Sequence, residues 1–144
     1  MFRSKKSLLF LIITIVSILA SGCESGTDTP DLKEDQLIGS WILTRIIASY
    51  PDGKKDFTPE QKSIAMTISV NSDKTFRRVQ TLNGTLTDDS GTWTISGNVL
   101  MVSLTSGSFN FPCQIDGNKL QASTTMNDPD TGAMVPVIFE FTKQ

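Results

Sequence analysis

The sequence predicts an all-β domain of eight antiparallel strands that closes into an up-and-down barrel, with one short helix between strands 1 and 2. Apolar and polar residues alternate with a period of two from residue 37 onward, which indicates strands with one buried face. Turn-forming pairs such as Asn83-Gly84 and Gly117-Asn118 separate these stretches, so successive strands are joined by tight hairpins. A meander of this length commonly closes on itself, because closure removes the exposed edges.

Each strand is placed by its own run of alternation. The predicted strands cover residues 38–47, 63–71, 74–82, 85–96, 98–105, 108–116, 119–127 and 134–142. The sixth contains Pro112, which has no amide hydrogen to donate and therefore predicts an edge, a bulge or a break in the closure of the barrel.

The third strand departs from simple alternation. If Phe76 points into the barrel, then Arg78 and Gln80 lie on the same face. A bulge that turns Arg78 to the rim and Val79 inward is the favoured interpretation, because a buried unpaired charge is costly. The alternative is an inward Arg78 that pairs with the carboxylate of a fatty acid or a similar amphiphile.

The first connection, residues 48–62, breaks the strand pattern. It contains the turn Pro51-Asp52-Gly53 and then Thr58-Pro59-Glu60-Gln61. Thr58 as the N-cap, proline at the first helical position and Gln61 three residues after the cap form a capping box. A short helix is therefore predicted here, lying across one mouth of the barrel.

The first 22 residues have the features of a secretory signal peptide. Arg3, Lys5 and Lys6 give a basic start, and an apolar run follows at residues 8–20. That run is shorter than the roughly 20 helical residues that cross a bilayer, so a membrane-spanning helix is the less favoured alternative.

Ala20-Ser21-Gly22-Cys23 resembles the lipobox of bacterial lipoprotein precursors, with alanine where leucine is usual. The resemblance implies cleavage before Cys23, a diacylglyceryl group on its thiol and acylation of its amino group, for example by palmitate. Several acyl chains anchor a protein stably to a membrane. The expected location is thus the bacterial cell envelope, at the outer membrane. Residues 23–36, acidic and aperiodic, are predicted to form a flexible tether.

The charge of the mature chain limits its partners. Three of the 13 basic residues and none of the 15 acidic ones lie in the signal peptide, so the mature chain would carry a net charge of −5. An acidic domain without a basic stripe argues against binding to nucleic acid.

Catalysis is not expected. The chain has no histidine, which removes the usual general base near neutral pH. Cys113 alternates with apolar residues on an inward face, so we interpret it as part of the core rather than as a nucleophile. The acidic pairs Asp88-Asp89 and Asp128-Pro129-Asp130 lie in turn-rich stretches and match turns better than a calcium loop. No cofactor or metal ion is expected.

Leu37, Gly39 and Trp41 open the first strand of the meander, and in this the chain resembles the lipocalin-like domain of small bacterial lipoproteins over residues 37–144. The resemblance implies that Trp41 packs over the closed end of the barrel near a basic residue of the last strand, for which Lys143 is the candidate. The Thr-Asp-Tyr motif and the C-terminal helix of animal lipocalins are missing.

These observations lead to a function hypothesis with two alternatives. The first is a lipid-anchored, non-enzymatic protein that binds a small apolar or amphipathic ligand in or at the mouth of the barrel. The second is a protein-interaction module of the cell envelope, an assembly accessory or a hydrolase inhibitor, in which the same aromatic residues simply fill the core. The candidate ligand-binding residues are Trp41, Met66, Phe76, Arg78, Trp93, Phe109, Phe111 and Phe139.

Overall fold

The structure is a computed structural model that describes residues 30–128 and 131–144. The predicted signal peptide and Cys23 lie outside the described residues. The folded unit covers Asp31–Gln144. Its elements, in chain order, are α1 (Glu34–Leu37), β1 (Gly39–Tyr50), β2 (Gly53–Phe57), the 3-10 turn η1 (Glu60–Lys62), β3 (Ile64–Val70), β4 (Thr75–Leu82), β5 (Thr85–Ser96), β6 (Val99–Leu104), β7 (Gly107–Asp116), β8 (Lys119–Asn127) and β9 (Met134–Lys143).

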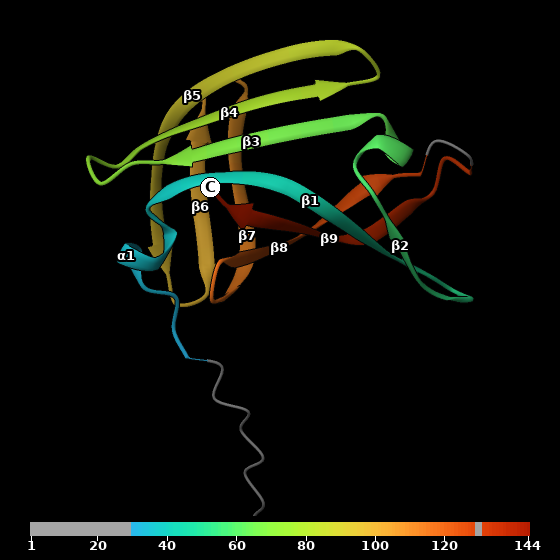
Figure 1. Ribbon diagram of the computed structural model, residues 1–144, viewed down its shortest axis with the longest axis horizontal. Coiled ribbons are helices and arrows are strands. Elements are labelled where there is room, and N and C mark those ends of the chain that lie inside the picture. Colours follow the sequence, from blue (N-terminus) through green and yellow to red (C-terminus); the bar gives the residue numbers. More distant parts are fainter. Residues whose placement is uncertain (1–29, 129–130) are drawn as a thin grey trace, which may run out of the picture. The chain divides into compact units, whose positions relative to one another are not determined.

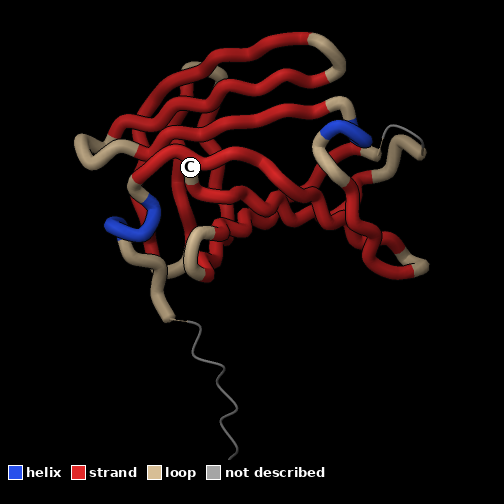
Figure 2. Tube along the Cα trace, viewed as in Figure 1, coloured by secondary structure: helices blue, strands red, loops and turns tan. Residues whose placement is uncertain are grey.

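Eight of the strands form a closed antiparallel barrel, as the sequence predicts. From β3 to β9 each strand pairs with the next, β3 also pairs with β1, and β9 returns to pair with β1 (Figure 1). The alternating residues of these strands point inward into one continuous apolar core. Figure 2 shows how little of the folded unit lies outside strands.

The connection between the first two barrel strands differs from the prediction. It contains a ninth strand, β2, which forms a hairpin with residues 46–50 of β1. β1 therefore continues beyond residue 47, because β3 occupies its edge at residues 39–42 and β2 takes over that edge further along. Phe57 of β2 packs against a small cluster formed by Ala48, Val135 and Val137, so the hairpin has apolar contacts of its own.

The predicted helix exists as the single turn η1. The predicted capping box is present, since the Thr58 amide donates to the Gln61 side chain at 2.8 Å and the Gln61 amide donates to the Thr58 hydroxyl at 3.4 Å. Such reciprocal bonds satisfy amides that a helix start leaves without partners.

The end of the predicted tether belongs to the folded unit. Leu32 and Leu37 are both buried in the main core, and α1 lies between them. The Leu32 amide donates to the Asn98 side chain at 2.8 Å. Burial of two leucines outweighs the polar character of the segment around them. The folded unit therefore begins at Asp31, six residues before the start at residue 37 that the sequence analysis expects.

The two ends of the barrel differ in construction. α1, the C-terminus and the turns at 71–74, 97–98 and 117–118 gather at one end, the closed end. The turns at 51–52, 83–84 and 105–106 and the segment η1 gather at the other, the open end. In Figure 1 α1 marks the closed end at the left, and the β4–β5 and β1–β2 turns mark the open end at the right.

The closed end is sealed by Trp41, as the family resemblance implies. Trp41 is fully buried and donates from its indole to the Leu37 carbonyl at 2.8 Å. The Lys143 ammonium lies 5.1 Å from the centre of its ring and donates to the Gln36 carbonyl. Trp93, also buried, has an analogous partner in Lys74 at 4.4 Å.

The barrel is incompletely paired between β7 and β8. Their ladder covers residues 113–116 and 119–122, and it ends at Pro112. The Cys113 amide donates to the Asn98 carbonyl on the β6 side at 2.7 Å, so the neighbouring position 112 would donate toward β8. Proline has nothing to donate there, so the predicted interruption takes the form of a gap in the β7–β8 ladder, while the barrel stays closed through residues 113–116.

No helix among the described residues is long and apolar enough to span a bilayer.

Candidate functional site

The interior of the barrel contains a cavity of about 270 Å³. Its wall is mainly apolar and comes from β3, β4, β6, β7, β8 and β9. The neutral polar residues of that wall are Gln80, Thr124 and Thr125. Ligand pockets in proteins typically measure about 300–1,000 Å³, so this cavity fits a small ligand or one end of a longer one.

Arg78 lies in the wall of this cavity, which corrects the favoured sequence interpretation. β4 pairs with β3 and β5 in unbroken register, and no bulge turns Val79 inward. Phe76, Arg78, Gln80 and Leu82 all line the cavity. The Arg78 side chain is 20% exposed, and its guanidinium carbon lies 5.6 Å from the centre of the Phe109 ring.

Asp89 makes the inward position of Arg78 possible. The two residues are direct cross-strand partners on β4 and β5, and Nη2 of Arg78 lies 3.6 Å from Oδ2 of Asp89. The Asp89 side chain is only 6% exposed and accepts a hydrogen bond from the Ser106 hydroxyl. That bond, with help from backbone amides of Ser106 and Thr105 and the charge of Arg78, holds the pKa of Asp89 below its usual range. The half-buried cation is therefore paired with an ionised carboxylate.

The candidate ligand-binding residues separate into two groups. Six of them, Met66, Phe76, Arg78, Phe109, Phe111 and Phe139, line the cavity. Trp41 and Trp93 lie at the closed end and seal it instead. Phe109 and Phe111 are half-buried and stacked, with ring centres 6.1 Å apart. They belong to the part of β7 that has no pairing with β8, so they form the side of the cavity nearest the gap.

Two polar residues of the site, Asp89 and Ser106, escape prediction from the sequence. Asp89 lies within the predicted strand 85–96, but from the sequence it is interpreted as half of an acidic pair that suits a turn, whereas in β5 it is buried and faces Arg78. The signal that could identify it is the strand register: a hairpin turn at Asn83-Gly84 places position 89 opposite position 78.

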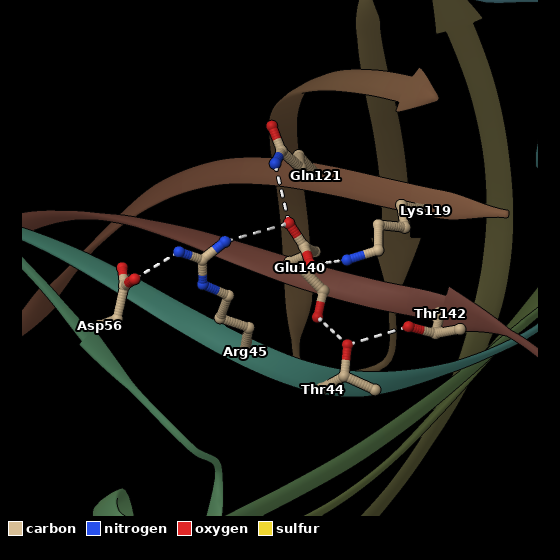
Figure 3. Close-up of polar contacts among 7 residues, drawn as sticks. All are labelled: Thr44, Arg45, Asp56, Lys119, Gln121, Glu140 and Thr142. Carbon is tan, nitrogen blue, oxygen red and sulfur yellow. Dashed lines mark hydrogen bonds and ion pairs between the residues drawn. The ribbon is translucent and has the colours of Figure 1, made fainter. Parts of the chain in front are cut away.

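A second hollow, of about 440 Å³, lies on the outer surface of the barrel beside a set of paired polar side chains (Figure 3). We name this set the outer polar cluster; its members are Thr44, Arg45, Asp56, Lys119, Gln121, Glu140 and Thr142. Its centre is Glu140, a buried carboxylate that accepts from Lys119 at 2.7 Å and from Gln121 at 2.9 Å. Those two bonds lower the pKa of Glu140.

The outer polar cluster ties neighbouring strands together. Arg45 of β1 lies between Asp56 of β2 and Glu140 of β9 and forms an ion pair with each. Thr44 donates to the Glu140 carbonyl at 3.2 Å and lies 3.0 Å from the Thr142 hydroxyl. Because its charges are satisfied within the cluster, we assign it a role in stability rather than in binding.

Cys113 packs in the core, as the sequence analysis predicts. Burial raises the pKa of its thiol to about 12, so the thiolate needed for nucleophilic chemistry does not form near neutral pH. Within the described parts of the chain, no group of three or more potential metal ligands comes together.

Comparison with known proteins agrees with this architecture. A family model described as the lipocalin-like domain matches residues 37–132. The structure of a lipocalin-like protein from Bacteroides uniformis is 16% identical, with a TM-score of 0.50 over 76% of this chain and 99% of that chain. An uncharacterized protein from Bacteroides eggerthii is 13% identical, with a TM-score of 0.48 over 75% of this chain and 99% of that chain. No curated protein matches the sequence. At 16% identity, the first of these two structures bears on the fold alone.

Proposed function

Because the chain belongs to the lipocalin-like domain family, we propose that it binds a small apolar or amphipathic molecule in the barrel cavity, without catalysing a reaction. The observation that carries this proposal is the cavity itself, with its apolar wall and its single guanidinium. A wall of this kind recognises an apolar body through burial and orients it through few polar contacts. The protonated thiol of Cys113 offers no nucleophile to a bound molecule.

The proposal places this binding at the surface of a bacterial membrane. Cys23 would carry the lipid anchor, and the folded unit begins at Asp31, a few residues further along the chain. The outer membrane is the proposed location. Replacement Cys23→Ser tests the anchor: the variant should leave the detergent phase in a partitioning assay, and retention equal to that of the wild type would refute it.

The binding proposal is tested by native mass spectrometry on the full chain, purified from a cell envelope without organic solvent. A bound small molecule is expected. Thr124→Phe, which fills the cavity from its wall, should abolish the adduct, whereas the neighbouring Ser123→Phe, exposed on the outer face of β8, should keep it. An adduct that both variants retain, or none after exposure to envelope lipids, would contradict the proposal.

A protein-interaction module remains the second candidate, and one observation favours it. Leu86 and Met134 lie at the open end and are 67% and 61% exposed, so a protein partner that covers them would bury their apolar surface. If the protein is an interaction module, the double variant Leu86→Ser/Met134→Ser should abolish co-purification of an envelope protein. The ligand-binding proposal predicts no such protein partner.

A further inference from the structure

The one charged side chain among the described residues of the cavity wall already has a counter-charge. Arg78 faces Asp89 at 3.6 Å, and Asp89 is held from behind by the Ser106 hydroxyl. The pKa of Asp89 lies below its usual range mainly because of that hydroxyl, so the carboxylate is ionised at neutral pH. The cavity therefore presents a neutral ion pair to a ligand rather than a free positive charge.

One hydrogen-bond donor of this pair remains without a partner. Nε of Arg78 is shielded from solvent and makes no hydrogen bond within the described part of the chain. A buried donor without an acceptor costs free energy. Because Nε is shielded, a ligand oxygen reaches it only when the Arg78 side chain turns toward the cavity, and that contact would remove the cost. The other polar residues of the wall are uncharged, and they also suit a neutral ligand group; they are Gln80, Thr124 and Thr125.

We propose that the cavity selects a neutral amphiphile whose polar group is an uncharged oxygen, as in an alcohol, an ester or a ketone, over the carboxylate of the same chain length. This inference rests on the proposed function and names the ligand class of the same site. A carboxylate at Arg78 would place a second anion beside the buried Asp89 in a mainly apolar wall, where like charges repel more strongly than in water. A neutral oxygen accepts from Nε without that repulsion.

The test compares decanol, methyl decanoate, decanoate and decane as ligands of the full chain in maltoside detergent at pH 7. Affinity is measured by titration calorimetry, and the Nε–H signal of Arg78 is followed by NMR, its assignment fixed by its loss in Arg78→Lys. The alcohol and the ester should bind at least about tenfold more tightly than decanoate. Both should shift the Nε–H signal.

Two variants separate the effect of the ion pair from general charge. Asp89→Asn removes the counter-charge and keeps an oxygen for Ser106, so decanoate should become the preferred ligand. Asp88→Asn is the matched control. Asp88 lies next to Asp89 on β5 but faces outward, where it pairs with Arg77 of β4, so this variant should leave the order of affinities unchanged.

The outcomes distinguish this inference from the proposed function. Tightest binding of decanoate to the wild type would overturn the inference and leave the binding function standing; the wild-type order decides this even if Asp89→Asn fails to fold. Equal affinities for decanol and decane, with no shift of Nε–H, would also overturn it. If none of the four compounds binds, the proposed function itself fails.

Discussion

At the scale of single residues, Gly39 and Lys143 depend on each other at the closed end. Gly39 has φ = +144°, and a Cβ atom there would lie 2.6 Å from Cε of Lys143. That lysine covers Trp41 and donates to the Gln36 carbonyl, so a side chain at position 39 displaces a residue that closes the barrel.

Gly39→Ala is therefore expected to destabilise the protein more than Gly53→Ala. Both positions carry a positive φ, which costs about 1–3 kcal/mol for a residue with Cβ, but Gly53 has open space around it. The loss of the Lys143 contacts should add about 1 kcal/mol at position 39. Urea unfolding of the two variants measures the difference, and equal losses would show that Lys143 moves aside freely.

Glu140 gives the protein a defined response to acid. Its folded pKa is lowered, mainly by Lys119 and then Gln121, so its stabilising contribution is complete above the unfolded pKa of roughly 4.3 and is lost as the pH falls below it. Glu140→Gln should lower the free energy of unfolding at pH 7 by about 1–3 kcal/mol.

The same variant should also flatten the pH dependence of stability. Between about pH 5 and pH 3, the wild type should lose more stability than Glu140→Gln, because the variant has no proton to take up there. Lys119→Met removes the partner and should flatten the curve in part. Denaturant titrations across this range give the answer, and parallel curves for all three proteins would contradict the role of Glu140.

At the scale of elements, the gap between β7 and β8 predicts a pattern of amide exchange. Cys113 donates toward β6, and alternate residues of a strand donate to opposite sides. The amides of Ser108 and Asn110 therefore face the unpaired side, whereas those of Phe109 and Phe111 face β6. Hydrogen exchange followed by NMR should be faster at Ser108 and Asn110, by at least about tenfold. Uniform protection along β7 would mean that the ladder continues past Pro112.

At the scale of the whole molecule, the segment before β1 is part of the fold. Leu37 is fully buried, Leu32 nearly so, and the Leu37 carbonyl accepts the indole hydrogen bond of Trp41. A chain beginning at Ile38 should therefore be less stable than one beginning at Asp31, by about 3–6 kcal/mol for two leucine side chains. Thermal unfolding compares them, and equal midpoints would place these leucines outside the cooperative core.

The barrel and its apolar lining follow from the sequence alone. Alternation with a period of two is a local property that fixes which residues face inward, and turn residues at short intervals leave few options except a meander. The break at Pro112 is equally local, because a missing amide hydrogen cannot pair anywhere. Five of the eight candidate ligand-binding residues, all except Trp41, Arg78 and Trp93, line the cavity for this reason.

Only the tertiary structure decided what depends on register and on long-range contact. Arg78 faces inward because Asp89 lies opposite it on the next strand. Without knowledge of that partner, the cost of burying an isolated charge argues for an outward Arg78. β2 exists because its edge-sharing with β1 and the packing of Phe57 compensate for a short, charged sequence. Leu32 and Leu37 join the core because the closed end offers them a place to pack. Local sequence patterns specify which residues face inward and where the chain turns. The pairing of charged side chains and the packing of the segment before β1 depend on contacts between residues far apart in the chain.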